Sequence, residues 1–277
     1  MAWFRSGCGR DEERPASRFR GNLSGQSART TAATALGALR DFLLPLCCAV
    51  CDRLMSPADS GVVCGHCWSR VHELPNPRCP RCGHPSDRYT CRWCSFLPPY
   101  VRAARSYCWM GSGTGEEIVY ALKYDGWTAV AAAMAHRMAR VSWPTDVVEE
   151  RSGIVPAPLS AARMRERGFN QATAIAAALA PLWGCPLWEN VLVRTSGTVS
   201  QTQLTPGERK SNVAGAFSVP LTAQVAVRGS HIVLLDDVIT TGATLSACAS
   251  ALFAAGARTI SYMTFGRAPS SGDRLSP

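Results

Sequence analysis

The segment from His231 to Thr244 limits the fold of this chain more than any other stretch. It reads HIVLLDDVITTGAT, an apolar run that ends in two acids and continues into a Thr/Gly turn. Residues 232–235 have the continuous apolar character of a strand buried in a parallel sheet, whereas Leu245 to Ala255 is rich in Ala and Leu and predicts a helix. This order of strand, loop and helix predicts an α/β fold with a ligand site at the carboxyl end of the strand.

The loop after this strand carries groups that bind phosphate and sugar. Three threonine hydroxyls can donate to a phosphate, and Gly242 allows the backbone to approach it closely. Asp236 and Asp237 suit a ribose diol, although an acid pair here can also be a Mg²⁺ site or a helix cap. The whole string resembles the phosphoribosyl pyrophosphate (PRPP) signature of type I phosphoribosyltransferases, in which two acids contact the ribose hydroxyls and the Thr/Gly loop wraps the 5′-phosphate. The residues that this resemblance assigns to PRPP are Asp236, Asp237, Thr240, Thr241, Gly242, Ala243 and Thr244.

Cysteines impose the second constraint. Thirteen are present, and eight of them form four C-x-x-C pairs between residues 48 and 94. Each pair can present two thiolates on one tight turn, and two such turns complete a closed, structural zinc site. Because the first residues lack an apolar signal segment, zinc explains the pairs better than disulfides or unligated thiols. The predicted zinc ligands are Cys48, Cys51, Cys64, Cys67, Cys79, Cys82, Cys91 and Cys94.

The spacing leaves the pairing of these four turns open. Adjacent pairing gives one site from the first two turns and another from the last two. An interleaved arrangement or a single ion would use the turns differently, and Cys47 could replace Cys48. Either way, the pattern predicts a metal that stabilises the fold, since closed four-cysteine sites rarely catalyse.

Three further stretches narrow the resemblance. They are ALKYDG at 121–126, VPAPLS at 155–160 running into RMRERGFNQA at 163–172, and QTQL at 201–204 leading to ERKSNVAGAF at 208–217. Together with the cysteine pairs, they resemble the ComF family over about residues 36–268. The resemblance implies a zinc-finger protein with a phosphoribosyltransferase-like domain, associated in competent bacteria with the uptake or use of single-stranded DNA.

The same resemblance assigns a pyrophosphate loop and a lid. Residues 155–160 match the loop that holds pyrophosphate, where N–H groups of the Pro-Ala-Pro turn can meet an anion. The arginines that follow can neutralise pyrophosphate, or they can be the solvated start of a helix. Residues 195–212 fit the mobile lid that closes over PRPP in this superfamily. The residues assigned are Pro158, Leu159, Ser160, Arg163, Arg165 and Arg167 for pyrophosphate, and Gln203, Arg209 and Asn212 for the lid.

Hydrophobic patterning predicts the organisation of the chain. We expect a disordered tail at 1–32, a helix and double-zinc-ribbon-like module at 33–100, a domain of type I phosphoribosyltransferase fold at 101–268 and a second tail at 269–277. The fold class is α/β, with a mostly parallel sheet flanked by helices. Strands are expected near 103–110, 153–156, 189–193, 215–219, 231–235 and 258–265, and helices near 115–123, 127–141, 169–181 and 243–255.

If the domain is an enzyme, it displaces pyrophosphate at the anomeric carbon of PRPP. Mg²⁺ bound with PRPP would neutralise the leaving group, and Asp236 and Asp237, the catalytic pair, would orient the ribose. An acceptor base normally needs a hood. Because only 12 residues follow Phe265, that hood must come from the zinc module or from residues 111–150. The sequence does not identify the acceptor.

Charge points to a competing hypothesis. The formal net charge is +9, and +7 of it lies before residue 111. Such an excess attracts nucleic acid, or it is a solvated surface. The alternative to an enzyme is therefore a PRPP-binding module in DNA uptake, with single-stranded DNA and a DNA-uptake helicase as partners. A transcription regulator is disfavoured because no helix-turn-helix segment is evident. The sequence contains no apolar run of about 18 residues, so no membrane span is predicted. We expect a cytoplasmic protein.

Two groups of side chains in the module are candidates for holding a strand. Five aromatic residues can stack on bases, or they can form the small core of the module. They are Trp68, Tyr89, Trp93, Phe96 and Tyr100. The arginines expected to contact phosphates are Arg78, Arg81, Arg88 and Arg92.

Overall fold

The computed structural model describes residues 46–56, 59, 61–86, 91–124, 128–195, 215–269 and 273. Residues from Leu46 onwards belong to one compact unit. The predicted tail at 1–32, the helical pattern before residue 45 and the three lid residues lie outside the described residues.

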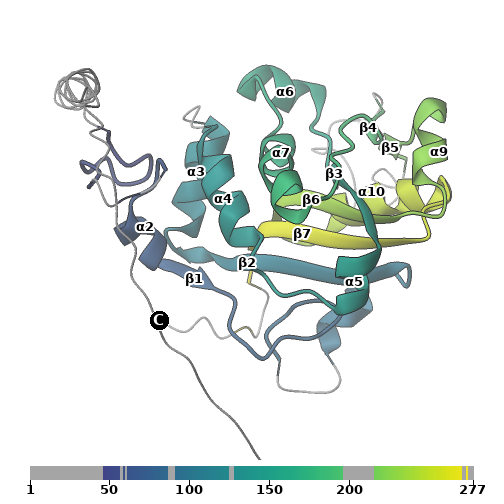
Figure 1. Ribbon diagram of the computed structural model, residues 1–277, viewed down its shortest axis with the longest axis horizontal. Coiled ribbons are helices and arrows are strands. Elements are labelled where there is room, and N and C mark those ends of the chain that lie inside the picture. Colours follow the sequence, from purple (N-terminus) through teal and green to yellow (C-terminus); the bar gives the residue numbers. More distant parts are fainter. Residues whose placement is uncertain are drawn as a thin grey trace, which may run out of the picture. The chain divides into compact units, whose positions relative to one another are not determined.

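A five-stranded sheet forms the centre of this unit (Figure 1). The spatial order of its strands is β1-β2-β7-β6-β3, in which β2, β7, β6 and β3 run parallel and β1 is antiparallel to β2. The bounds are β1 Val71–Glu73, β2 Val101–Gly113, β3 Arg151–Pro156, β6 His231–Ile239 and β7 Thr259–Arg267. The prediction of a mostly parallel sheet is confirmed.

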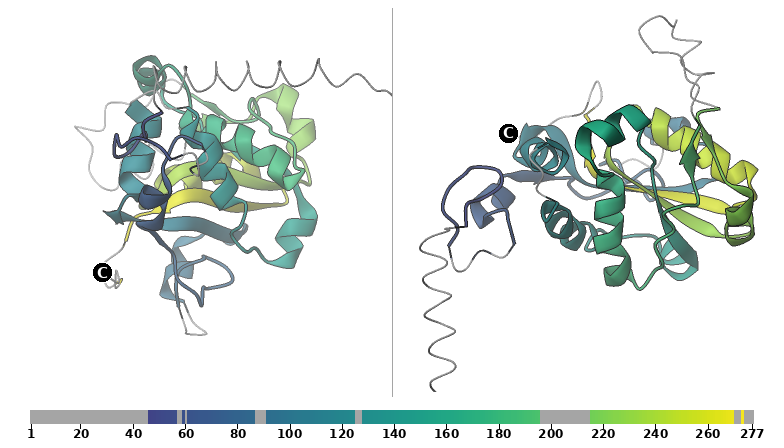
Figure 2. Two further views of the ribbon diagram at one scale, coloured as in Figure 1. Left: turned by 60° about the vertical axis from the view of Figure 1, so that its left-hand side comes forward. Right: turned by 90° about the horizontal axis from the view of Figure 1, so that it is seen from above.

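Helices cover both faces of the sheet (Figures 1 and 2). On one face lie α3 (Gly115–Tyr124), α4 (Val130–Met138) and α7 (Gln171–Trp183), and on the other lies α10 (Ala243–Ala254). Alternate side chains of β6 point to opposite layers. Val233 and Leu235 pack with α3, α4 and α7, whereas Ile232 and Leu234 pack with α10. The apolar run of the sequence is therefore buried on both sides, as predicted.

Shorter elements complete the unit. They are α2 Gly65–Ser69, α5 Thr145–Glu150, α6 Ala161–Arg167, α9 Gln224–Val227, the 3-10 turns η1 Arg92–Phe96 and η3 Leu221–Ala223, and an antiparallel ribbon of β4 Val193–Arg194 and β5 Phe217–Ser218. The predicted strands at 189–193 and 215–219 are thus two residues each and form a ribbon of their own. Their apolar pattern has another cause, because Val191, Leu192 and Ala216 pack into the core on the α10 side of the sheet.

Strand β6 is longer than predicted. It continues beyond Leu235 to Ile239 because Asp236, Val238 and Ile239 stay in register with Thr264, Gly266 and Arg267 of the equally long β7. The acid pair therefore lies inside a hydrogen-bonded strand and not in the loop after it. This placement restricts the backbone conformation of both aspartates.

The first cysteine turns pack directly against the α/β layers. Cys48, Cys64 and Trp68 share a hydrophobic core with residues of α3 and α4, and the Thr114 hydroxyl donates to the Cys67 carbonyl. Among the described residues, the structure contains no helix with both the length and the apolar character needed to cross a membrane.

Candidate functional sites

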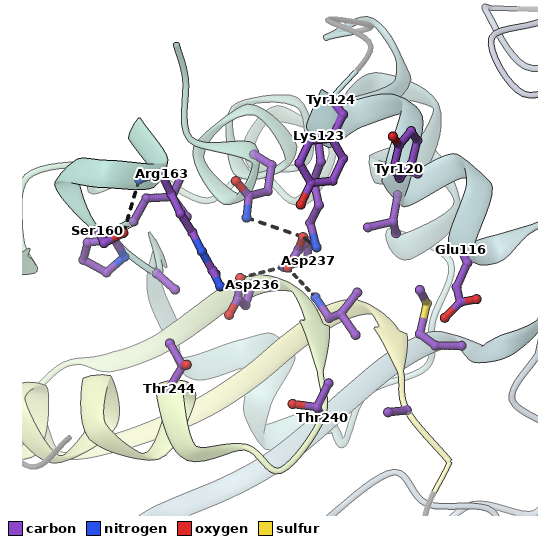
Figure 3. Close-up of a pocket in the computed structure, with 18 of the residues that line it drawn as sticks. Glu116, Tyr120, Lys123, Tyr124, Ser160, Arg163, Asp236, Asp237, Thr240 and Thr244 are labelled. Atoms are coloured by element: carbon purple, nitrogen blue, oxygen red, sulfur yellow. Dashed lines mark hydrogen bonds and ion pairs between the residues drawn. The ribbon is translucent and has the colours of Figure 1, made fainter. Parts of the chain in front are cut away.

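A pocket of about 770 Å³ opens at the carboxyl ends of β3 and β6 (Figure 3). Helix α3 forms one wall and the start of α6 forms another. The predicted residues that line it are Asp236, Asp237, Thr240, Thr244, Pro158, Leu159, Ser160 and Arg163. Two segments far apart in the sequence meet here because β3 and β6 are parallel neighbours. This is the edge at which the strand order predicts a ligand.

The two acids have different surroundings. Asp237 is only 5% exposed, and its carboxylate lies 2.5 Å from the Lys123 ammonium and accepts from Gln171 Nε2 at 3.4 Å and from the Val238 N–H at 2.8 Å. Asp236 points toward the α10 layer, where burial and the neighbouring charge of Asp237 raise its pKa well above the usual range for Asp. The Asp237 carboxylate is thus already paired with a cation. The ionised form of Asp236 is disfavoured, and a bound cation or a ligand hydroxyl beside it would stabilise that form.

The Thr/Gly turn has the backbone of an anion site. Gly242 adopts φ 74°, which disfavours other residues, and it caps α10. At the start of α10 the Ala243 N–H donates to the Thr241 hydroxyl at 3.4 Å, whereas the N–H groups of Thr244 and Leu245 have no partner within a helix of this kind. They border a small concavity of about 40 Å³ that Thr240, Thr241 and Ala243 also line. The turn therefore places the N-terminus of α10 and the hydroxyls of Thr240 and Thr244 next to Asp236.

The Pro-Ala-Pro turn offers fewer donors than the sequence suggested. The Ala157 N–H donates to the Leu235 carbonyl at 2.8 Å, and the two prolines have no N–H. Leu159 and Ser160 remain, and no backbone partner of their N–H groups occurs in the described part of the chain. Ser160 also caps α6, because its hydroxyl accepts from the Arg163 N–H at 3.3 Å.

The three arginines of α6 have different positions relative to the pocket. Arg163 lines the pocket, whereas Arg165 is exposed and does not line it. Arg167 donates to the Tyr124 hydroxyl at 3.1 Å and lies over the Tyr124 ring. A helix turns by 100° per residue, so Arg165 points away from the side of α6 that carries Arg163. Arg167, four positions from Arg163, is on the same side of the helix and contacts Tyr124. Of the three predicted arginines, Arg163 is the one that lines the pocket.

Several residues that line the pocket, or that hold lining residues in place, were not predicted from the sequence. Asn170 caps α7 through the Ala172 N–H and donates to the Ala157 carbonyl, and the next residue, Gln171, contacts Asp237. Lys123 is one of only two lysines in the chain, which was the available signal for a special role. The others line the α3 wall, with a helical spacing that could have revealed them: Glu116, Glu117, Tyr120 and Tyr124.

Two clusters of four cysteines form away from the pocket. Their members are Cys48, Cys51, Cys64 and Cys67 in the first cluster and Cys79, Cys82, Cys91 and Cys94 in the second, and the sulfur atoms of each lie within 4.8 Å of one another. Adjacent turns therefore pair, and Cys47 belongs to neither cluster. The sulfur–sulfur distances of 3.4 to 3.8 Å exclude disulfides, whose bond is about 2.05 Å. They fit a tetrahedral Zn²⁺ with Zn–S bonds of about 2.3 Å, which separates the sulfurs by about 3.8 Å.

Known proteins are similar in sequence to most of this chain. Proteins named DNA utilization protein YhgH from Salmonella typhimurium and Salmonella typhi are 31% and 30% identical to the chain over 225 residues, covering 78% of the chain and 95% of each relative. Competence protein ComFC of Bacillus subtilis is 26% identical over 233 residues, covering 76% of the chain and 90% of that protein. The chain belongs to the ComF family.

A family model and two solved structures also match part of this ComF chain. A family model described as a double zinc ribbon domain matches residues 39–96, which contain both clusters. Among solved structures, glutamine PRPP amidotransferase of Bacillus subtilis is 19% identical with a TM-score of 0.38, over 54% of this chain and 30% of that enzyme. A hypoxanthine phosphoribosyl transferase of Trypanosoma cruzi is 14% identical with a TM-score of 0.32, over 53% and 66%. Likenesses of this strength do not transfer an activity to the ComF chain.

Arginines of the cysteine-rich module and of the neighbouring strand β2 donate to backbone carbonyl groups. Arg81 donates to the Leu97 and Pro98 carbonyls, and Arg78 donates to the Leu74, Pro75 and Ser106 carbonyls. Arg105, 6% exposed, donates to the carbonyls of Ser142, Ala104 and Pro80. Each guanidinium replaces water at buried carbonyl oxygens. Arg78 and Arg81 are therefore unsuitable as probes of phosphate contact, contrary to the expectation from sequence.

The contacts of the aromatic residues in the cysteine-rich module also favour a role in its core. Trp68 is buried beneath the Arg137 guanidinium, and Tyr100 stacks on Phe253 with ring centroids 4.3 Å apart. Trp93 packs beside His84. Tyr89 lies outside the described residues, as does the side chain of Phe96. A base could not stack on the ring faces that Arg137 and Phe253 cover without displacing these partners.

Replacing Lys123 by Met is expected to destabilise this ComF chain by about 3 kcal/mol, since it leaves the buried Asp237 carboxylate without its cation. Thermal unfolding measures the effect, which corresponds to about 6–12 °C for a unit of this size. Lys123→Arg keeps the charge and is the matched control. The double variant with Asp237→Asn should recover part of the loss, because neither charge is then left alone. Equal stability of Lys123→Met and the parent chain would contradict the ion pair.

Proposed function

We propose that this ComF-family chain binds PRPP together with Mg²⁺ and takes part in the uptake or use of single-stranded DNA. The observation that carries the proposal is that three kinds of group line one pocket: the acid pair, the residues Thr240 and Thr244 that flank the Thr/Gly turn, and the Ser160–Arg163 segment. The rest of the turn lines the adjoining small concavity. A ribose diol, a 5′-phosphate and a pyrophosphate need these groups. The lid residues Gln203, Arg209 and Asn212 and the division at residues 100/101 are part of this proposal.

The acid pair has room for the ribose hydroxyls. Gln171 is 3% exposed and lines the pocket, and its Oε1 has no donor among the described residues. A buried acceptor without a donor is costly, so a ligand hydroxyl beside Asp237 would stabilise it. Lys123 and Gln171 hold the Asp237 carboxylate in place for that contact.

Mg²⁺ fits beside Asp236 better than beside Asp237. The Lys123 ammonium already neutralises Asp237, whereas Asp236 makes no ion pair within the described part of the chain. Mg²⁺ in proteins usually binds through one or two carboxylates and the phosphates of a substrate. Its chemical contribution is to neutralise charge on the pyrophosphate. Asp236, the α10 N-terminus, Leu159, Ser160 and Arg163 are the groups that would hold and orient PRPP around it.

Calorimetric titration with PRPP tests the proposal. We expect binding in the presence of Mg²⁺, much weaker binding with EDTA, and weaker binding of ribose 5-phosphate, which lacks the pyrophosphate that Arg163 would contact. The proposal fails if PRPP with Mg²⁺ produces no heat at millimolar concentration while the chain remains folded.

A second candidate is a true phosphoribosyltransferase. The pocket continues past the acid pair along α3, within the 111–150 region where a hood for an acceptor was expected. Catalysis would come from positioning: the acids fix the ribose, the loop fixes the 5′-phosphate, and Arg163 stabilises the departing pyrophosphate. Incubation with labelled PRPP and bases, nucleosides or single strands, with detection of released pyrophosphate, separates the candidates.

Binding of single-stranded DNA should depend steeply on salt. Arg53, Arg70 and Arg140 are exposed, and their side chains have no ion pair or hydrogen bond within the described residues. Changing all three to Glu should flatten the log–log salt dependence by about 0.7 for each DNA phosphate that is no longer neutralised. PRPP affinity should stay unchanged, because none of the three lines the pocket. Fluorescence anisotropy with a labelled oligonucleotide measures the salt dependence.

Arg228→Glu, an exposed position on the α/β part, is the matched control for that experiment. If the control weakens DNA binding as much per charge as the triple variant does, the attraction comes from net charge and not from a site. Absence of DNA binding at moderate salt, with pyrophosphate release to a small acceptor, would favour the plain enzyme. That result would also argue against a DNA-uptake helicase as a partner.

A further inference from the structure

One face of α3 forms a continuous wall of the pocket beyond the acid pair. Glu116, Tyr120 and Lys123 follow at intervals of four and three residues, so they lie along the same side of the helix. Lys123 fixes the position of this wall, because its ammonium is bound to Asp237. Tyr120 and Glu116 then lie one and two turns farther from the ribose position (Figure 3).

Tyr120 offers an aromatic surface that its neighbours do not fill. Its side chain is 58% exposed although it lines a pocket, and the Tyr124 ring packs against it at 4.8 Å. Arg167 covers Tyr124 from another direction. The two tyrosines thus form one aromatic surface, and Tyr120 is the ring available for stacking on a flat ligand.

The α3 wall is acidic, in contrast to the anion side of the pocket. Glu116 and Glu117 are exposed at its start. Among the described lining residues the cations are Lys123, Arg163 and Arg194. The first is bound to Asp237, the second lies on α6 and the third on β4, where it lies over Phe217. A ligand that touches the α3 wall therefore meets hydrogen-bond acceptors and negative charge.

We propose that this face of α3 is the acceptor subsite and that it takes a flat nitrogen base carrying an exocyclic amino group. The inference rests on the proposed PRPP site. Tyr120 stacks on the ring, and the carboxylates of Glu116 and Glu117 accept from the amino group. Acceptors that carry a carboxylate are excluded by repulsion from the same two residues. Bases whose edge holds only carbonyl groups and ring N–H bind more weakly.

The position suits the reaction. The acid pair lies between the α6 side chains, where pyrophosphate would lie, and the α3 side chains (Figure 3). A base on α3 approaches the anomeric carbon from the side opposite the leaving group. A ring nitrogen forms the new bond with its lone pair, while the bond from that carbon to the pyrophosphate oxygen breaks and its electron pair leaves on pyrophosphate. The ring N–H proton passes to water, so charge and atoms balance.

The test measures PRPP binding first and base binding second, by calorimetry on the full chain, with released pyrophosphate followed in the same samples. With Mg²⁺ and PRPP present, adenine or cytosine should bind at least about tenfold more tightly than uracil, and orotate should not bind. Tyr120→Ala should reduce the affinity for adenine by about tenfold, because it removes one stacking contact with the base. It should leave PRPP affinity unchanged. Glu116→Gln with Glu117→Gln should reduce the preference for adenine over orotate.

Glu149→Gln, an exposed position on α5 away from the pocket, is the matched control and should change nothing. Orotate binding as tightly as adenine, or adenine binding unaffected by Tyr120→Ala, overturns the acceptor subsite. If PRPP binds and no base does, the subsite falls while the PRPP site stands. If PRPP itself does not bind, both fall.

Discussion

Changing Cys79 and Cys82 to Ser is expected to make the chain insoluble or to unfold its second cysteine cluster, with the loss of one bound Zn²⁺. Each cluster presents four thiols at zinc-ligand spacing, and structural zinc sites contribute about 10–16 kcal/mol of apparent binding energy that is also folding energy. The backbone around Cys82 depends on this geometry, since its carbonyl accepts from Arg267 on β7 at 2.8 Å. Losing the metal should therefore disturb the end of the central sheet as well.

Metal analysis and circular dichroism of the purified, reduced protein measure this effect. We expect two Zn²⁺ per parent chain, about one in any Cys79→Ser, Cys82→Ser protein that remains soluble, and about one when Cys48 and Cys51 are changed instead. Cys47→Ser is the matched control, because Cys47 belongs to neither cluster. Less than about half an ion per parent chain after gentle purification would contradict structural zinc.

Changing Asp236 and Asp237 to Asn is expected to weaken PRPP binding by about two to four orders of magnitude. Each charged hydrogen bond to a ribose hydroxyl contributes about 1.5–3 kcal/mol, and both acceptors lose their charge. Calorimetry at fixed Mg²⁺ measures the change. Asp146→Asn, at the exposed ion pair with Arg102 outside the pocket, is the control and should leave PRPP affinity unchanged.

The two single variants should differ in stability, and this separates a binding role from a structural one. The pKa of Asp236 is raised in the folded state, so its ionised form destabilises the fold above the unfolded pKa, and Asp236→Asn should unfold at the same or a higher temperature near pH 7. Asp237→Asn should unfold at a lower temperature, because it leaves the Lys123 ammonium unpaired. Unchanged PRPP affinity in both variants would exclude this acid pair as the ribose site.

The sequence alone identified the features that depend on neighbouring residues. A buried strand, two acids, a Thr/Gly turn and an Ala-rich helix follow one another in 231–255, and their order determines both the fold class and the edge of the sheet that carries the pocket. The eight cysteines were identified because two thiolates on one turn are a local arrangement. The double zinc ribbon match and the two clusters agree with that reading.

Tertiary structure decided which residues far apart in the sequence contact one another. Spacing could not choose among pairings of the cysteine turns, since each turn can complete a site with any other that packing brings near it. The ion pair of Lys123 with Asp237 and the commitment of Arg78 and Arg81 to carbonyl oxygens follow from the packing of α3 and the module. Charge counting treats every arginine as equal, whereas burial determines which guanidinium groups remain for a ligand. The α3 wall arises likewise, because only the fold places Glu116 and Tyr120 beside the end of β6.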